Sequence, residues 1–378
     1  MQKCSRLLSI DELETGMICA NEIKEQKCVL IGQDVTITES LINKLKSIYF
    51  CDKIAVYCDE SNAIEYSLDI NDDIIIENSK IIDDTFNTEN VKSKGIKICE
   101  QIEKEFNALA LDVQRIFENM EHLKASSMDE IRKFAARIQN ELEYASYIIK
   151  DIVLYGSGSD TIYRHCVNVA ALSAILGSWA GLSKKELNLL TYAAVLHDFG
   201  KTKIDKEILD KPGPLTDQEF SVVKKHSIIG YDFIKNVKFL DKAVSYGVLM
   251  HHEKADGSGY PLGLTSNKIH KFAKIIAIAD IFDAVNSDRN YKKSKKPFEA
   301  LKLIQRESLI KLDYELCSTF LNRVINYYLG ENVLLNNGIT CKIIQININN
   351  IEKPLLYEGN TFINLNHQRD LYIEKLLL

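Results

Sequence analysis

Seven titratable side chains fall within apolar helical segments in the middle of this sequence. The spacing is helical, as where Leu190 and Ala194 lead to His197, and neighbours at such intervals share one helix face. Five helices are therefore expected to direct imidazoles or carboxylates at the interior. The seven residues are His165, His197, Asp198, His226, His251, His252 and Asp280.

A lone histidine on an apolar face is more often a hydrogen-bonded core residue than a ligand. Burying seven titratable groups, however, needs a common positive partner, and a metal site supplies one. Five imidazoles and two carboxylates exceed what one catalytic ion usually takes from a protein. We therefore expect two ions bridged by Asp198, roughly 3.5 to 4 Å apart, which would activate a shared water for in-line attack on a phosphoester.

Lys201 follows His197 by four residues and allows two interpretations. Its ammonium could stabilise charge on phosphoryl oxygens or protonate a leaving oxygen. It could equally be a surface lysine at a helix C-terminus, where the helix dipole favours cations. The spacing alone leaves both open.

The elements that must hold these residues are mainly helices. Capping boxes begin two of them, at Ser183 to Glu186 and at Thr216 to Glu219, and the prolines of 212–214 force a turn before the second. We expect the helical region to span residues 125–330. One continuous apolar stripe is expected to run from Val222 through His226 to Phe233.

The flanking segments differ in pattern. Residues 1–65 alternate β-branched runs such as KCVLIG and KIAVYC with a helical stretch near SLINKLKSI, which predicts a small α+β module. Residues 66–124 are acidic and then helical, which predicts a linker with a surface for a homodimer. Residues 331–378 contain short strand-like runs, which predict a short β-rich tail.

Composition limits the class of protein. The chain has 378 residues, a net charge of -6 and nine scattered cysteines, the pattern of reduced thiols in a reducing compartment. No secretory signal or long apolar segment is visible, so we expect a cytoplasmic protein without membrane insertion. The acidic balance argues against a partner that is a nucleic acid polymer, whereas a small anionic ligand could bind the local basic run at 289–296.

Two motifs carry a family resemblance. HDFGK at 197–201 and HHEKADGSGYP at 251–261, with flanking YRHCVNVAAL, KKHSIIGYDFI and AIADIFDAVNSDRNYKK in the same order, resemble the HD-GYP proteins, a bacterial branch of the HD phosphohydrolases. The resemblance covers roughly residues 125–330. It implies a mainly α fold, with an all-α HD-type helical bundle as the catalytic domain.

The resemblance also implies an activity and a cofactor: metal-dependent hydrolysis of cyclic di-GMP to linear pGpG, and in some members onward to GMP, with two divalent ions, usually iron or manganese. It assigns one ion to His165, His197, Asp198 and Asp280, and the other to Asp198, His226, His251 and His252. Asp198 and Lys201 are the expected catalytic residues. The expected substrate-binding residues are Lys201, Asp256, Gly257, Tyr260, Arg289, Tyr291 and Lys292.

One departure from the family pattern bears on the product. Thr161 stands where some members carry a glutamate for a third metal, and a neutral hydroxyl is a poor ligand for a hard cation. We therefore expect two metals and pGpG as the product, with GMP less favoured. Two alternatives stay open: a phosphodiesterase for another cyclic dinucleotide such as cyclic GMP-AMP, because pocket contacts choose the base, and a weakly catalytic cyclic di-GMP-binding signalling module. Glu253 is expected to support one of the histidines.

Overall fold

The chain divides into two compact units, Met1–Phe86 and Asn87–Leu378, which are described separately. The structure, a computed structural model, describes residues 5–9, 13–14, 16–18, 23–25, 28–31, 37, 53–57, 88–121, 127–155, 162–237, 240–286, 298–359 and 361–377.

The first unit contains two antiparallel strand pairs among its described residues. β1 (Ser5–Ser9) pairs with β4 (Lys53–Tyr57), and β2 (Ile23–Glu25) pairs with β3 (Cys28–Ile31). β3 and β4 coincide with the two β-branched runs of the sequence, so these strand predictions are confirmed. The helix expected near residues 40–48 lies outside the described residues.

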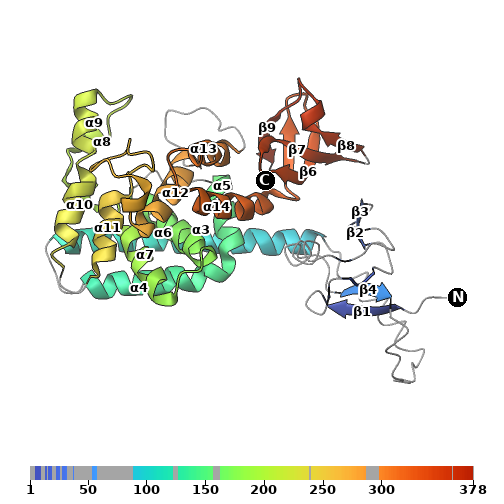
Figure 1. Ribbon diagram of the computed structural model, residues 1–378, viewed down its shortest axis with the longest axis horizontal. Helices are drawn as coiled ribbons and strands as arrows, with labels where there is room; N and C mark the ends of the chain where they lie inside the picture. The colour runs from blue at the N-terminus through green and yellow to red at the C-terminus, as the bar shows by residue number, and fades with distance from the viewer. Residues whose placement is uncertain are drawn as a thin grey trace, which may run out of the picture. The chain divides into compact units, whose positions relative to one another are not determined.

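The second unit is mostly helical (Figure 1). Its α-helices are α3 (Thr88–Glu121), α4 (Ser127–Asn140), α5 (Ala145–Tyr155), α6 (Ile162–Trp179), α7 (Lys184–Leu196), α8 (Lys206–Leu209), α9 (Asp217–Val223), α10 (His226–Ile234), α11 (Lys242–Met250), α12 (Lys271–Asn286), α13 (Glu299–Glu307) and α14 (Tyr314–Val324). Short 3-10 helices are η3 (Glu141–Tyr144), η4 (Phe199–Lys203), η5 (Ser266–Lys268), η6 (Ile325–Tyr328) and η7 (Leu365–His367).

Helix α6 lies in the middle of this bundle. It packs against α3, α7 and α12, and its residues from Cys166 to Gly177 are all buried. A helix that is apolar on every side is stable only when other elements surround it. α6 therefore forms the centre on which the neighbouring helices are assembled.

The long helix α3 belongs to the same core. Phe106, Leu109, Val113, Ile116 and Phe117 are buried, and α3 packs against α4, α5 and α6. The apolar stripe of the segment expected to be a linker is thus used within the second unit. The boundaries drawn at 65, 124 and 330, and a dimer formed through 66–124, stay predictions.

The C-terminal segment forms a five-stranded antiparallel sheet in the order β8-β7-β6-β5-β9, which confirms the β-rich tail. Alternate residues of β6 such as Cys341 and Ile343 are buried, as expected for a strand with one face on the core. The strands are β5 (Asn332–Leu335), β6 (Thr340–Asn347), β7 (Asn350–Glu358), β8 (Thr361–Asn364) and β9 (Ile373–Leu377).

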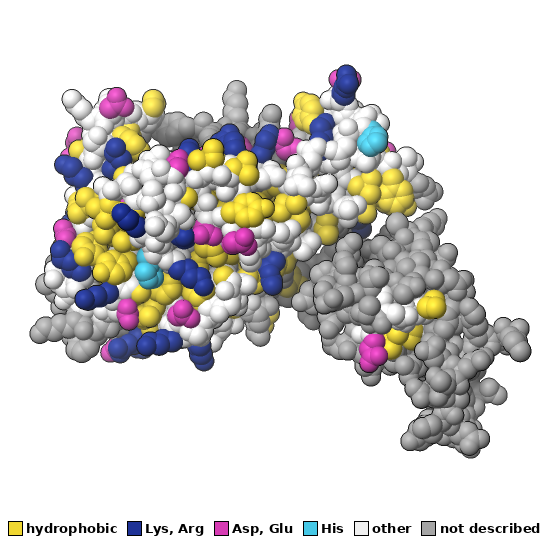
Figure 2. Space-filling model, in the orientation of Figure 1, with side chains coloured by type: hydrophobic (Ala, Val, Ile, Leu, Met, Phe, Trp, Pro, Cys, Tyr) yellow, Lys and Arg dark blue, Asp and Glu magenta, His cyan; other side chains and the backbone are white. Residues whose placement is uncertain are grey.

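Surface charge on the second unit is mixed. On the face drawn in Figure 2, Lys and Arg side chains of the described residues are interspersed with acidic and apolar side chains. Among the helices of the described residues, none is long and apolar enough to cross a membrane.

Candidate metal centre

Three imidazoles are oriented by the same kind of hydrogen bond, from the ring to a nearby backbone carbonyl. His197 and His251 lie at the C-terminal ends of α7 and α11, and His226 is the first residue of α10. Each Nδ1 lies 2.6 to 2.7 Å from the backbone carbonyl oxygen three residues earlier. Because a carbonyl only accepts, each Nδ1 carries the proton and donates, which leaves each Nε2 with a lone pair. That tautomer is the one that ligates a metal through Nε2.

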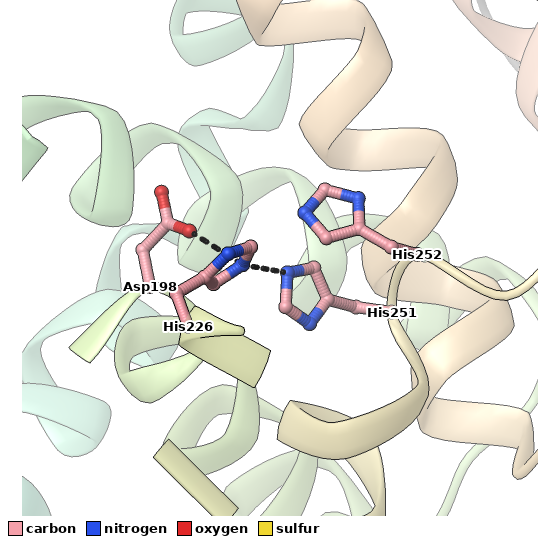
Figure 3. Close-up of side chains that lie close together, drawn as sticks. All are labelled: Asp198, His226, His251 and His252. Carbon is pink, nitrogen blue, oxygen red and sulfur yellow. Dashed lines mark hydrogen bonds and ion pairs between the residues drawn. The ribbon is translucent and has the colours of Figure 1, made fainter. Parts of the chain in front are cut away.

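These Nε2 atoms surround the carboxylate of Asp198. Oδ2 lies 3.5 Å from His197 Nε2, and Oδ1 lies 3.4 Å from His226 Nε2. The Nε2 atoms of His226 and His251 are 3.3 Å apart. Figure 3 shows Asp198 and the rings of His226 and His251, which come from separate chain segments, turned toward one another.

His252 approaches the same point from the end of α11. Its ring centroid lies 4.0 Å from that of His251, and its Nδ1 lies 4.0 Å from Asp280 Oδ2. The two adjacent histidines therefore supply two directions toward one cluster, in which Asp198, His226, His251 and His252 could share an ion.

A second cluster adjoins the first. His165 Nε2 lies 3.2 Å from Asp280 Oδ1 and 3.7 Å from Asp198 Oδ2. Its Nδ1 lies 2.6 Å from Asp283 Oδ2, which accepts a hydrogen bond from it. His165, His197 and Asp280 form a group with the spacing of metal ligands, and the carboxylate of Asp198 lies between the two groups.

The charge states suit cation binding. Burial and neighbouring imidazoles hold the pKa of His251 well below its usual range, and burial also lowers the pKa values of His197 and His226. Burial would raise the pKa of Asp198, but the ammonium of Lys201 holds it well below its usual range. Neutral imidazoles around a carboxylate are the protonation states that a divalent ion needs.

His165 differs because its partners are anionic. Burial lowers its pKa, yet the hydrogen bonds and charges of Asp280 and Asp283 more than offset this and raise the pKa to about 10. Without an ion, the proton on this ring is the positive charge that the two carboxylates share. An ion held by the same group would replace that proton.

Two buried atoms at the junction lack hydrogen-bond partners among the described residues. They are His197 Nε2 and Asp198 Oδ1. Leaving a buried acceptor unsatisfied costs about 1 to 3 kcal/mol. A cation at the junction would satisfy both atoms, and the imidazole and carboxylate donors suit first-row divalent ions. The residues present therefore fit the expected metal.

A close backbone contact brings α10 to this place. A Cβ added at Gly200 would lie 1.9 Å from the carbonyl oxygen of His226 and 2.8 Å from the amide of Gly230. Only glycine permits this approach of η4 and α10. The glycine of HDFGK thus sets the distance between Asp198 and His226.

The loop after His252 is tied back to the helix end in a similar way. A Cβ at Gly259 would lie 2.5 Å from His252 O, and both carboxylate oxygens of buried Glu253 accept from the loop amides of Leu262 and Leu264. Glu253 supports the loop, so the expectation that it supports a histidine is wrong. The loop in turn places the ring of Tyr260 against His252, with centroids 4.7 Å apart.

The comparisons agree with this geometry. Residues 115–316, more than half of the chain, match the family described as the HD domain. The chain belongs to the HD domain family. The resemblance of its two motifs to HD phosphohydrolases is thereby confirmed.

Relatives of this HD domain chain are named as phosphodiesterases. RpfG of Xanthomonas campestris, a cyclic di-GMP phosphodiesterase response regulator, is 36% identical over 179 residues, which cover 47% of this chain and 44% of RpfG. The cyclic di-GMP phosphodiesterase PA4108 of Pseudomonas aeruginosa is 33% identical, covering 56% of this chain and 49% of PA4108. The 3'3'-cGAMP-specific phosphodiesterase 3 of Vibrio cholerae is 32% identical, covering 43% of this chain and 35% of that protein. The chain thus spans half or less of the length of each of these relatives.

Only some of the expected substrate-binding residues of this HD domain that the structure describes lie at the cluster. Lys201 lies at the cluster, with Nζ 2.6 Å from Asp198 Oδ2, and Tyr260 covers His252. Asp256 is exposed and accepts hydrogen bonds from Ser258 within its own loop, where Gly257 has a φ of 82°. Arg289, Tyr291, Lys292 and Thr161 lie outside the described residues.

One expected element is corrected. The apolar stripe from Val222 to Phe233 was expected on a single helix, but α9 ends at Val223 and α10 begins at His226. The turn at Lys224 and Lys225 lets His226 begin a new helix at the cluster. The periodicity hides the break because the stripe resumes on the second helix.

Two buried residues were not predicted. Asp283 accepts from His165, and Asn168 Nδ2 donates to Asp283 Oδ1 over 2.7 Å. Their spacing held a signal, since Asn168 follows His165 by three residues and Asp283 follows Asp280 by three. Carboxylates that hold a metal-ligating imidazole are a general feature of metal sites.

Proposed function

We propose that this chain is a metal-dependent phosphodiesterase that hydrolyses cyclic di-GMP to linear pGpG. The observation that carries the proposal is the pair of ligand groups joined at Asp198, with His197 Nε2 and Asp198 Oδ1 buried and without hydrogen-bond partners among the described residues. Membership of the HD domain family and relatives named as cyclic di-GMP phosphodiesterases support the substrate class.

Two ions would be held by the two groups, one by His165, His197, Asp198 and Asp280, the other by Asp198, His226, His251 and His252. When bound, such a pair lowers the pKa of water and stabilises both the attacking and leaving oxygens of an in-line displacement. Iron or manganese is the proposed metal, and imidazole and carboxylate ligands suit either.

Lys201 is proposed to act on the phosphate as a fixed charge. Burial lowers the pKa of its ammonium, but the carboxylate of Asp198 more than offsets this and raises it. The side chain keeps its proton at neutral pH and exposes 24% of its surface beside the cluster. It can therefore stabilise negative charge on the phosphoryl oxygens as the bond from phosphorus to the ribose 3' oxygen breaks.

Tyr260 is proposed to wall the nucleotide pocket. Its ring lies on His252, and its centroid lies 6.4 Å from that of Phe220, a residue that is 45% exposed. Burial and the carboxylates of Asp280 and Asp198 raise the pKa of its phenol, so the ring stays neutral. Neutral aromatic faces suit the stacking of a nucleobase.

The remaining expectations from the sequence are proposals as well. Binding of phosphate by Arg289, Tyr291 and Lys292, loop contacts from Asp256 and Gly257, a cytoplasmic location and pGpG as the end product are proposals. A second substrate, cyclic GMP-AMP, is favoured by one observation: relatives of comparable identity are named as specific for it.

The test is turnover by the purified full chain, loaded anaerobically with Fe(II) or Mn(II), with chromatography of the products. We expect cyclic di-GMP to disappear, pGpG to accumulate, and a chelated sample to be inactive. Equal or faster hydrolysis of 3'3'-cGAMP in parallel reactions would favour the second substrate. Protein that holds two ions and cleaves neither would refute the proposal.

A further inference from the structure

Arg164 is the largest fully buried side chain among the described residues, and it directly precedes His165. An arginine in a protein interior is costly unless its donors are paired. Most of its pairing comes from the long helix α3. Nη2 donates to Glu103 Oε2 over 2.7 Å, Nη1 donates to Asn107 Oδ1 over 2.9 Å, and the guanidinium lies 5.2 Å from the centroid of Phe106.

The same guanidinium also points toward the cluster. Its Nε donates to Asn168 Oδ1 over 3.2 Å, and Asn168 Nδ2 donates to Asp283 Oδ1 over 2.7 Å. Asp283 Oδ2 then accepts from His165 Nδ1 over 2.6 Å. A continuous series of hydrogen bonds therefore joins α3 to the ring whose Nε2 faces Asp280 and Asp198.

The part of the series between α3 and His165 is protected from water. Arg164, Asn168 and Asp283 each have 0% of their surface exposed. Water cannot replace a lost bond there, so each member is held by the next. The Asn168 amide is also oriented one way, because its oxygen faces a cation and its NH2 faces an anion.

We propose that Arg164 is a positioning residue: by bridging Glu103 and Asn168 it makes the direction of His165 Nε2, and so the affinity of the His165 group for its ion, depend on α3. This rests on the proposed function only in requiring that the cluster binds a metal. Partners of this kind typically change metal affinity 10- to 100-fold when they are lost.

Helix α3 supplies a matched pair of variants. Glu103 bonds Arg164, whereas Glu105, two residues on, bonds Arg137 of α4 over 2.6 Å. The two glutamates are alike in exposure, at 37% and 34%. Each substitution by glutamine removes one carboxylate charge facing an arginine and keeps an amide oxygen that can accept, but only Glu103→Gln weakens the series that leads to His165.

The experiment is calorimetric titration of Mn(II) into metal-free full chain, with the melting temperature measured in parallel. We expect Glu103→Gln to weaken one Mn(II) site about tenfold and leave the other unchanged. Glu105→Gln should leave both sites unchanged even where it lowers the melting temperature. Arg164→Lys, which keeps the charge but not the fork, should weaken the same site.

Equal Mn(II) affinities in wild type and both glutamine variants would overturn the inference while leaving the proposed function standing. So would a lower melting temperature in Glu103→Gln with both sites intact, because that is the result of a purely structural ion pair. Wild-type chain that binds no Mn(II) would overturn the proposed function and this inference together.

Discussion

At the residue scale, the cluster is defined by titratable side chains that are buried beside one another. Asp198 is 1% exposed, and its carboxylate faces Lys201 and several imidazoles. The six other predicted ligands are brought to the same place from α6, α7, α10, α11 and α12 or their ends. Their helical spacing with apolar residues was enough to predict that they face inward.

The residues that hold these ligands were harder to predict. Backbone carbonyls fix the rings of His197, His226 and His251. Because every residue type has a backbone carbonyl, the sequence does not reveal which one accepts. Asp283 did leave a mark through its spacing from Asp280, but the same spacing fits any amphipathic helix. The partner of a ligand becomes visible only when the helices are placed together.

Lys201→Met tests the fixed charge beside Asp198. Removing one donor that stabilises the transition state typically costs about 10²- to 10³-fold in kcat. We expect a loss in that range with the bound metal retained, measured by steady-state kinetics and metal analysis. Lys203→Met is the control, because the ammonium of Lys203 lies over the Phe233 ring. An equal loss in both variants would contradict the assignment.

At the element scale, turns and helix ends decide where the ligands meet. Both predicted capping boxes are confirmed. Ser183 and Glu186 form the box at the start of α7, and Thr216 and Glu219 form the box at the start of α9. Local chemistry fixes these starts, so sequence reveals them. The break before His226 depends instead on the contact between Gly200 and α10, which joins elements distant in sequence.

Gly200→Ala tests this contact. The added methyl would overlap His226 O, so α10 must shift, and overpacking typically costs about 1 to 3 kcal/mol. We expect a lower melting temperature and loss of metal from the His226 group.

Gly181→Ala is the control for that variant, since Gly181 has a φ of 76° with no atom near its added Cβ. It should destabilise the chain through backbone strain alone and keep its metal. Full metal content in Gly200→Ala would show that the glycine does not position His226.

At the scale of the whole molecule, the second unit is built so that its core and its cluster are continuous. α6 carries both the centre of the apolar core and His165, and the helical half of the expected linker packs on it as α3. Periodicity predicted that α3 is amphipathic but could not say whether its apolar face meets this chain or another. Among the described residues, the packing of α3 on α6 shows that this apolar face contacts the chain's own core.

Metal removal should therefore loosen the whole helical unit. An ion that binds only the folded chain stabilises it by about 2.7 kcal/mol at a concentration one hundred times its Kd. We expect chelation to lower the melting temperature by several degrees and Mn(II) to restore it, as measured by scanning calorimetry. Identical melting curves with and without the ion would argue that the cluster is a satisfied polar core.

The most direct test of the central claim is the rate of cyclic di-GMP hydrolysis by metal-loaded Asp198→Asn beside Asp232→Asn. Both changes remove one carboxylate charge, but Asp232 is an exposed residue of α10 that pairs with Lys235. The account predicts that Asp198→Asn loses hydrolysis and bound metal while Asp232→Asn keeps both. Hydrolysis at the wild-type rate by Asp198→Asn would contradict it.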